Sequence, residues 1–350
     1  MTDEELLARA VPALLAWYPA HKKDLPWRVE GNPYAVWISE VMLQQTRTTA
    51  AIPYYLRFIG ELPDVAALAA VPEDRLMKLW EGLGYYSRAR HLRQAAVTVM
   101  TDFGGRMPST AALLRTLPGV GDYTAGAIAS IAFGEPEPAV DGNVLRVVMR
   151  LLASDEDVLR DTTKKRVAAL LRAVYPSGKD AGTLTQAWME LGENVCIPNG
   201  TPACDACPLV AFCRARLGQT VALYPVRSPK KPRRIEERTV LLLRAGDAVA
   251  LTRRPPRGLL AGLYEFPNYE GTPDDLSAWC SAHGVTPVSV TPIGNATHLF
   301  SHIEWRMQGV EVALTASAGD FLWVPLSELF ASFAIPSAFR YFTEYLRKEI

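Results

Sequence analysis

Hydrophobic residues recur every three to four positions through the first two thirds of the chain, a period that predicts amphipathic helices. Helices are predicted over Glu4–Tyr18 and over Tyr34–Ala51. Asn32 and Pro33 favour the start of the second helix, because the first is a cap residue and the second suits a first turn. From Thr239 onward the pattern takes the period of strands. The chain is therefore predicted to join a mainly α region to an α+β region.

The α+β region is predicted to begin with a hairpin. Its strands are Thr239–Arg244 and Ala248–Arg253, joined by a turn over residues 245–247. Helices are predicted near Leu276–His283 and at Pro336–Glu349, with further strands between them. This mixture of short strands and flanking helices predicts a separate domain with its own core.

Two short helices joined by a glycine-containing turn are predicted near the middle of the α region. Ser109 can cap the first helix, Thr110–Thr116. Asp122 can cap the second, Tyr123–Phe133, whose Ala and Gly residues permit close packing. A proline-containing break follows, and then another apolar helix over Val144–Ala153.

The turn between these helices has Gly119, Val120 and Gly121 at its tip. Pro118 and Gly119 end the first helix, and Gly121 allows a positive φ. Backbone N–H groups at the start of the next helix can then hold a phosphate oxygen without reading base sequence. An ordinary αα-corner is the alternative interpretation of such a turn.

Composition and charge bound the function only loosely. The 350 residues favour two or three domains, and 49% hydrophobic residues suffice for a large core. Since 37 basic residues balance 37 acidic ones, any nucleic-acid footprint must be local. No run reaches transmembrane length and no signal peptide is recognised, which predicts a cytoplasmic, reducing compartment.

Four of the five cysteines fall within eighteen residues. They are Cys196, Cys204, Cys207 and Cys213, with seven, two and five intervening residues. Disulfides are disfavoured in a reducing compartment, so this clustering predicts a metal site. Zinc sites more often show two paired knuckles. Cys280 lies apart and is predicted to be a buried free thiol.

A candidate acid lies on the predicted helix Tyr34–Ala51. Glu40 has apolar neighbours along this helix, namely Trp37, Val41 and Leu43. A carboxyl desolvated by such neighbours has a raised pKa and can hold a proton near neutral pH. By pattern alone, a solvated glutamate on the polar face of the helix is the simpler interpretation.

The run Gly-Leu-Gly-Tyr-Tyr-Ser-Arg-Ala-Arg at residues 82–90 is a candidate nucleic-acid contact. Tyrosines beside glycines suit a loop that enters a duplex, and the arginines that follow suit phosphate contacts. A tyrosine pair that packs two helices together is an equal alternative.

Several of these stretches together resemble a known family. Leu-Pro-Gly-Val-Gly-Asp-Tyr-Thr-Ala at 117–125, with Val-Asp-Gly-Asn-Val at 140–144, is similar to the helix–hairpin–helix glycosylases related to endonuclease III. Relatives that also cut the strand carry a Schiff-base lysine where this chain has Tyr123, and tyrosine cannot form an imine. Trp-Ile-Ser-Glu-Val-Met-Leu-Gln-Gln-Thr at 37–46 resembles the MutY-type adenine DNA glycosylases. This resemblance implies a monofunctional enzyme in which Glu40 is the essential acid.

The resemblance also implies roles for further residues. Asp141 would stabilise the oxocarbenium-like sugar, although it also suits a helix N-cap, while Tyr123 and Asn143 would orient the two carboxyl groups. The implied adenine pocket is lined by Arg28, Trp27 and Gln186. The residues implied to enter the duplex and contact the base opposite adenine are Gln45, Thr46, Leu83 and Tyr85.

The spacing of the four clustered cysteines resembles the loop that binds a 4Fe-4S cluster in endonuclease III and MutY. The first gap here holds seven residues where that family usually has six, and one extra loop residue is cheap to accommodate. The resemblance therefore implies a structural or redox-sensing 4Fe-4S cluster, with zinc as the alternative.

The α+β region resembles the MutT-like C-terminal domain of MutY proteins. It lacks the Arg-Glu-x-x-Glu-Glu helix that binds magnesium in Nudix hydrolases, so we expect a reader domain rather than a second hydrolase. Its run Phe300, Ser301 and His302 resembles the loop that inspects 8-oxoguanine. A surface hairpin, or a chance metal pair of His298 with His302, is the alternative.

The resemblance covers nearly the whole chain and predicts its domains. They are a helical glycosylase region at 1–216, a basic proline-containing linker at 217–237 and a MutT-like, 8-oxoguanine-recognising domain at 238–350. Within the glycosylase region, a six-helix barrel is expected at about 25–138 and an iron–sulfur subdomain from 1–24 plus 139–216.

The predicted function is hydrolysis of the N-glycosidic bond of adenine mispaired with 8-oxoguanine or guanine in double-stranded DNA. We expect a monomer of bacterial type that is cytoplasmic and associates with the nucleoid when on DNA. One alternative is an endonuclease III-like glycosylase and lyase for oxidised pyrimidines, which Tyr123, Glu40 and the added domain disfavour. The other is a non-catalytic lesion-binding protein, which has no need for both Glu40 and Asp141.

Overall fold

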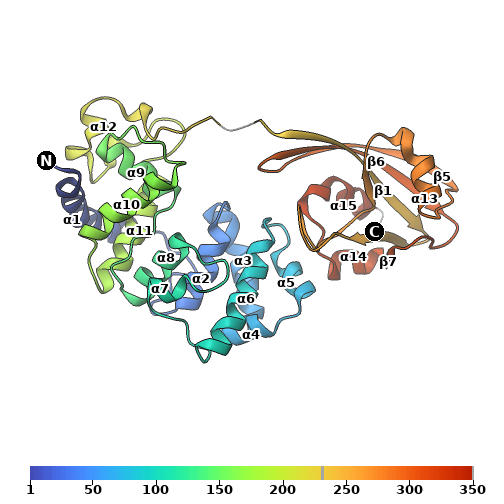
Figure 1. Cartoon of the computed structure of the whole chain (residues 1–350), viewed down its shortest axis with the longest axis horizontal. Coiled ribbons are helices and arrows are strands. Elements are labelled where there is room, and N and C mark those ends of the chain that lie inside the picture. The colour runs from blue at the N-terminus through green and yellow to red at the C-terminus, as the bar shows by residue number, and fades with distance from the viewer. Residues whose placement is uncertain (230–231, 349–350) are drawn as a thin grey trace. The chain divides into compact units, whose positions relative to one another are not determined.

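The chain folds into two compact units, shown as a computed structural model in Figure 1. The structure describes residues 1–229 and 232–348. The N-terminal unit comprises Met1–Ala70 and Arg90–Pro229, and the C-terminal unit comprises Val71–Ala89 and Lys230–Ile350. Each unit is described below by itself.

The N-terminal unit is built from helices. They are α1 (Asp3–His21), α2 (Pro33–Leu43), α3 (Thr48–Glu61), α4 (Val65–Ala70), α6 (Ser87–Asp102, which begins in the other unit), α7 (Ala111–Leu114), α8 (Asp122–Phe133), α9 (Gly142–Leu152), α10 (Asp161–Val174), α11 (Lys179–Asn194) and α12 (Arg214–Leu217), with 3₁₀ turns η1 (Cys204–Ala206), η2 (Val210–Phe212) and η3 (Val221–Leu223). Among the described residues, none of the helices combines the length and the apolar character that crossing a membrane requires.

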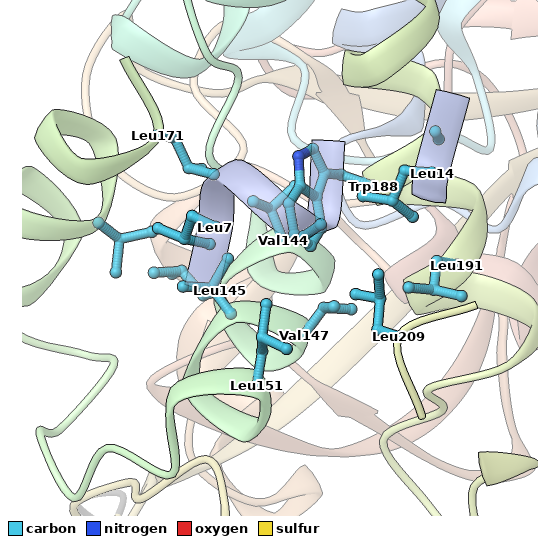
Figure 2. Packing of buried hydrophobic residues seen from close by; sticks show 14 of the residues in the cluster. Leu7, Leu14, Val144, Leu145, Val147, Leu151, Leu171, Trp188, Leu191 and Leu209 are labelled. Carbon is cyan, nitrogen blue, oxygen red and sulfur yellow. The ribbon is translucent and has the colours of Figure 1, made fainter. Parts of the chain in front are cut away.

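One hydrophobic core of this unit lies between α1, α9, α10 and α11. Figure 2 shows Leu7 of α1, Val147 of α9 and Trp188 of α11 among the side chains that meet there. Each fully buried side chain of this size stabilises the fold by about 1.5–3 kcal/mol. The helices approach closely where α11 carries glycine, since a Cβ at Gly192 would lie 2.6 Å from Cβ of Asn143. This packing fixes the start of α9 in place.

The single helix predicted over Tyr34–Ala51 is wrong, because the structure divides it. Helix α2 ends at Leu43 and α3 begins at Thr48. Between them Gln45 takes a φ of 63°, a left-handed conformation that a continuous α-helix does not contain. The segment has no proline or glycine at the break, so its sequence carries no signal that the helix stops.

The C-terminal unit is built around a sheet. Its strands are β1 (Arg234–Ala245), β2 (Ala248–Arg253), β3 (Tyr264–Glu265), β4 (Asn268–Glu270), β5 (Ser289–Leu299), β6 (Ile303–Leu314) and β7 (Leu322–Pro325). Its helices are α5 (Glu73–Trp80), α13 (Leu276–Ala282), α14 (Leu326–Ser332) and α15 (Arg340–Arg347), with 3₁₀ turns η4 (Pro273–Asp275) and η5 (Ser337–Phe339).

The strand order of the sheet is β3-β2-β1-β6-β5, with β4 paired to β1 and β7 paired to β2. Strands β1 and β6 are parallel, and the other pairs are antiparallel. The predicted hairpin is confirmed, since Ala245 of β1 pairs with Ala248 of β2.

Helices cover both faces of this sheet, as Figure 1 shows. Alternate residues of β1 point to opposite faces. Val240 and Leu242 pack with side chains of α14 and α15, whereas Leu241 and Leu243 pack with side chains of α13. Two hydrophobic cores, one on each face, therefore stabilise the sheet.

Three boundaries around the predicted linker and the predicted last helix are corrected. Strand β1 begins at Arg234, inside the linker predicted at 217–237, and residues 230 and 231 of that linker lie outside the described residues. The N–H of Val158 donates to the carbonyl of Val226 over 3.1 Å, so part of the predicted linker is bound to the N-terminal unit. The helix predicted at Pro336–Glu349 begins instead as η5 and continues as α15, and Glu349 lies outside the described residues.

Candidate active site

The predicted Pro-Gly-Val-Gly turn joins α7 to α8. Gly119 takes a φ of +75°, and a Cβ there would lie 2.5 Å from Cβ of His91. Gly121 allows a positive φ but does not adopt one, since its φ is −91° and its backbone is extended. Gly121 forms the N-cap of α8, so the first N–H groups of that helix follow the turn directly. The turn has the arrangement that can hold a phosphate oxygen.

The two predicted helix caps at this turn are each wrong by one residue. The hydroxyl of Thr110, rather than that of Ser109, accepts a hydrogen bond from the N–H of Leu113 over 3.4 Å. Asp122 is the first residue of α8 rather than its cap, and its Oδ1 accepts from Nε of Arg115 over 2.6 Å. Neighbouring cap-forming residues compete for one position, and sequence alone does not choose between them.

Glu40 lies on α2 and only 6% of it is exposed. The hydroxyl of Tyr123, on α8, donates a hydrogen bond to its Oε2. Burial raises the pKa of Glu40 to about 7, and the negative charge of Asp141 raises it further, whereas the Tyr123 hydroxyl and the Arg28 cation oppose the rise. Glu40 is therefore poised between its two protonation states near neutral pH.

Asp141 is the N-cap of α9. Its Oδ1 accepts from the N–H of Val144 over 2.7 Å, and its Oδ2 accepts from Nδ2 of Asn143 over 2.8 Å. Burial raises the pKa of Asp141, while these donors and the nearby Arg146 cation favour its ionised form. The cap and the carboxylate at the site are therefore the same group.

Tyr123 is the hydrogen-bond donor of Glu40. Burial raises the pKa of Tyr123 well above its usual range, and the charges of Glu40 and Asp141 add to the rise. The hydroxyl therefore keeps its proton and orients Glu40 by donating to one of its oxygens. A neutral acid beside a hydrogen-bonded carboxylate is the pair that hydrolysis of a glycosidic bond requires.

Arg28 lies near Glu40 and is held by residues of α1 and α11. Its Nη2 donates to Oε2 of Glu190 over 2.5 Å, and its guanidinium lies 5.6 Å from the ring centroid of Tyr18. The Tyr18 hydroxyl donates to Oε1 of Gln186 over 3.0 Å. Trp27 is buried, and its ring contacts that of Tyr55 edge-on at 5.3 Å between centroids.

Tyr18 and Glu190, the partners of Arg28, were not predicted from the sequence. Glu190 is 2% exposed on α11. Three of the four residues that lie three or four positions from it on this helix are polar, namely Gln186, Glu193 and Asn194, so the sequence predicts a solvated face and gives no signal of a buried ion pair. Its partner Arg28 is far away in the chain and could not be assigned from spacing.

The segments predicted to contact the base opposite adenine lie in tight turns. Gln45, at the break between α2 and α3, belongs to the N-terminal unit. Leu83 and Tyr85 follow α5 in the C-terminal unit, where Leu83 is 8% exposed and Tyr85 is 50% exposed. Tyr85 also takes a left-handed φ of 47°. Of these two, Tyr85 is the side chain that the C-terminal unit presents to solvent.

The Phe300–His302 loop forms the turn between β5 and β6. Phe300 packs edge-on against Trp305 at 5.0 Å between ring centroids, and its N–H donates to the carbonyl of Ile303 over 2.8 Å. Ser301 and His302 are exposed, and Ser301 Oγ lies 3.1 Å from Nδ1 of His302. Phe300 therefore anchors the loop, and the two polar residues form its tip.

Cys196, Cys204, Cys207 and Cys213 are free and line one cavity. Nη1 of Arg150 donates to Sγ of Cys196 over 3.3 Å, and burial raises the pKa of the Cys207 thiol to about 12. Within residues 1–229 and 232–348, no three His, Cys, Asp or Glu side chains converge as ligands of a single ion do. Four sulfurs around one cavity, with a cation beside them, form a donor set that suits a thiolate-bound metal centre. Cys280 is free and buried, as predicted.

Comparison with known proteins places both units in described families. The model of the HhH-GPD superfamily of base excision DNA repair proteins matches residues 38–176. The model of the NUDIX domain matches residues 239–345. The first match lies within the helical part of the chain, and the second covers most of the sheet-containing part.

Curated relatives match over most of this chain. The adenine DNA glycosylase of Mus musculus is 35% identical over 402 residues, which cover 95% of this chain and 77% of the mouse protein. That of Homo sapiens is 35% identical over 367 residues, which cover 86% of this chain and 66% of the human protein. Among solved structures, a thermostable thymine-DNA glycosylase matches with a TM-score of 0.55 and 26% identity, covering 61% of this chain and 98% of that one.

Proposed function

Because this chain belongs to the adenine DNA glycosylases of the HhH-GPD superfamily, we propose that it removes adenine that faces 8-oxoguanine or guanine in duplex DNA. It is a base excision repair enzyme that acts on N-glycosyl bonds. The observation that carries the proposed chemistry is the pairing of Glu40, whose pKa is about 7, with the hydrogen-bonded carboxylate of Asp141.

The adenine must leave the base stack before these groups can reach it. Extruding a base costs about a few kcal/mol, and a mispaired base costs least. The backbone N–H groups after Gly121 would hold a phosphate without reading sequence, so the duplex can be gripped at any position. The DNA sequence around the mispair should therefore have little effect on how tightly the protein binds.

Glu40 would act as the general acid. Tyr123 donates to Oε2, and among the described residues nothing donates to Oε1, so the carboxyl proton can sit on Oε1 and be delivered to the leaving base. As adenine departs with that proton, Glu40 becomes a carboxylate. It can then accept a proton from the water that attacks the sugar.

Asp141 would stabilise the positive charge that develops on the sugar. Its two oxygens accept hydrogen bonds from Val144 and Asn143, which fix its position before the substrate binds. A preorganised carboxylate in a desolvated site needs no reorganisation as the charge appears. Tyr123 cannot form an imine with the sugar, so the strand is left intact and the product is an abasic site.

Arg28, Trp27 and Gln186 would line the adenine pocket. The Arg28 guanidinium is held by Glu190 and lies against the Tyr18 ring, and Gln186 accepts from the Tyr18 hydroxyl. These fixed partners would keep polar groups of the pocket oriented when the base enters. Trp27 would contribute through its packing on Tyr55 rather than through a polar contact.

The four clustered cysteines would hold a 4Fe-4S cluster. The donor set consists only of sulfur, and the Arg150 guanidinium lies beside it, where it would balance the negative charge of the cluster thiolates. When bound, the cluster would cross-link the loop from Cys196 to Cys213. Zinc is the alternative occupant, and metal analysis together with the visible absorption spectrum distinguishes the two.

Recognition of the opposite base would be shared by several residues. One neutral hydrogen bond contributes about 0.5–1.5 kcal/mol, so Ser301 alone gives at most roughly tenfold discrimination. Gln45, Thr46, Leu83 and Tyr85 would add contacts with the DNA around the estranged base. Phe300 and His302 would hold and assist the Ser301 hydroxyl.

The proposal is tested with end-labelled duplexes that contain adenine opposite 8-oxoguanine, adenine opposite thymine, or thymine glycol opposite adenine. Each is incubated with the protein and read with and without hot alkali. We expect breaks from the adenine·8-oxoguanine duplex only after alkali. A Glu40→Gln variant purified in the same way controls for contaminating glycosylases and should give no strand breaks.

Other outcomes would support the alternative functions. Breaks at thymine glycol without alkali would mean that the chain is a lyase for oxidised pyrimidines and that the role given to Tyr123 is wrong. Tight binding of the lesion duplex without any breaks, by a protein that contains its metal, would mean a non-catalytic binder.

A further inference from the structure

Helix α5 lies between helices of the N-terminal unit along the chain, yet the segment Val71–Ala89 belongs to the C-terminal unit. Two charged residues near its end contact the backbone that leaves α14. Nζ of Lys78 donates to the carbonyl of Phe333 over 2.9 Å, and the N–H of Ile335 donates to Oε1 of Glu81 over 2.9 Å. The remaining oxygen of Glu81 accepts from Lys78 over 2.6 Å.

This contact combines buried apolar packing with charge-assisted hydrogen bonds. Ile335 and Ala334 are buried in the core of the C-terminal unit, and the ring of Phe333 packs edge-on against that of Tyr264. The side chain of Lys78 is 15% exposed, and its ammonium group lies at the C-terminal end of α14, where helix carbonyls carry partial negative charge. Hydrogen bonds with one charged partner are about twice as strong as neutral ones.

A second contact of α5, an ion pair with β2, is of a different kind. Nη2 of Arg253 lies 3.3 Å from Oδ1 of Asp74, with both side chains at least half exposed. Exposed pairs of this geometry contribute little, so Asp74 provides a matched comparison for Glu81 on the same helix.

The other side of Glu81 leads directly into the turn that carries Tyr85. Glu81 is the C-cap of α5, and the next residues reverse the chain through positive φ angles at Gly82, Gly84 and Tyr85. Nε1 of Trp80 donates to the carbonyl of Gly84 over 3.1 Å, so the turn folds back on the end of α5. Any shift of the end of α5 therefore displaces the exposed Tyr85 ring.

We propose that Lys78 and Glu81 are positioning residues that fasten the Gly82–Tyr85 turn to the C-terminal sheet. Through them the Tyr85 turn and the Phe300–His302 loop meet the DNA as parts of one unit, and the two contributions to reading the opposite base become interdependent. This inference rests on the proposed function for its biological meaning. The fastening itself is independent of any activity.

The test compares Glu81→Ala, Glu81→Gln and Asp74→Ala in the full-length protein. Hydrogen–deuterium exchange is measured at the amides of Ile335 and Leu83, because the first is bonded to Glu81 and the second to the Trp80 carbonyl within the turn. Single-turnover excision of adenine is measured opposite 8-oxoguanine and opposite guanine. Lys78→Met serves as a second variant if Glu81→Ala does not fold.

We expect Glu81→Ala to accelerate exchange at both amides and to lower the preference for 8-oxoguanine over guanine by about three- to tenfold, the loss expected when the displaced turn gives up one neutral contact near the opposite base. Glu81→Gln keeps an acceptor for Ile335 and should restore most of the protection. Asp74→Ala should change neither measurement.

Unchanged exchange in Glu81→Ala would overturn the fastening, and faster exchange with an unchanged preference would overturn its role in recognition. If the unaltered protein excises adenine from neither duplex, the proposed function fails. In that case the amide exchange at Ile335 and Leu83 still decides whether Glu81 positions the turn.

Discussion

The buried cluster of Glu40, Tyr123 and Asp141 and the Phe300–His302 loop differ in how their residues are held. In the cluster, Tyr123 donates a hydrogen bond to Glu40, and each ionisable group changes the pKa of the next. In the loop, Phe300 is anchored but Ser301 and His302 are exposed. Interactions of buried charged groups contribute large free energies, whereas hydrogen bonds of exposed polar groups contribute small ones. We therefore expect bond cleavage to depend on few residues and recognition to depend on many.

The largest effect is expected for Glu40→Gln. The change keeps the size of the side chain and an acceptor for the Tyr123 hydroxyl but removes the acidic proton. A positioned general acid contributes about 10²–10⁴-fold, so single-turnover excision should fall by that factor while binding of the mispaired duplex is retained. The measurement is the single-turnover rate with enzyme in excess, together with a binding isotherm.

The matched control for this variant is Glu30→Gln, which removes a negative charge from an exposed pair with Lys179. It should change neither rate nor binding, because an exposed pair contributes little. A Glu40→Gln variant that retained more than about a tenth of the activity would rule out the general-acid role.

A second expected effect concerns packing rather than charge. In Gly192→Ala the new Cβ would lie 2.6 Å from Cβ of Asn143, so α11 and the start of α9 must separate. Overpacking of this kind destabilises a protein by about 1–3 kcal/mol. Because Asn143 holds Asp141, excision should also slow. Urea unfolding and single-turnover kinetics measure the two effects.

Gly60→Ala is the control for that variant, since nothing lies within 4 Å of the Cβ it would add on α3. It should leave the rate unchanged and should not lower the free energy of unfolding, because alanine favours a helix more than glycine does. If Gly192→Ala behaved in the same way, the close approach of α11 to Asn143 would not matter for the site.

The dependence of the rate on pH tests the protonation state of Glu40. The acid must carry its proton to act, and burial raises its pKa to about 7. Single-turnover excision should therefore fall by roughly tenfold per pH unit above about pH 7. A rate that stayed constant up to about pH 9 would mean that the protonated form of Glu40 is not the active one.

Much of this organisation could be predicted from the sequence, because it depends on local patterns. The periodicity indicated the helices and the hairpin, and the acidic residue before an apolar helix indicated that Asp141 caps α9. The resemblance to a known family assigned the activity. Glu40 illustrates the limit of pattern alone, since only the fold shows that its apolar neighbours bury it.

The features that could not be predicted depend on residues that are distant in the chain. The pairing of Arg28 with Glu190 joins residues that no spacing rule connects. The break at Gln45 lacks a proline or glycine, so tertiary structure imposes it against the local pattern. The contact of Glu81 with Ile335 likewise joins α5 to a strand-rich region that begins far later in the chain.

The smallest expected effect is for Ser301→Ala in the exposed loop. One neutral hydrogen bond contributes about 0.5–1.5 kcal/mol, so the preference for 8-oxoguanine over guanine should fall by a factor of roughly two to ten, with little change in the rate opposite guanine. The measurement is the ratio of single-turnover rates on the two duplexes. Ser317→Ala, at an exposed serine after β6, is the matched control and should leave the ratio unchanged.

A preference that stayed wholly intact in Ser301→Ala would show that this loop does not read the opposite base. A loss much greater than tenfold would mean that Ser301 acts through more than its own hydrogen bond, and the exposed loop would then resemble the buried cluster in its dependence on single residues.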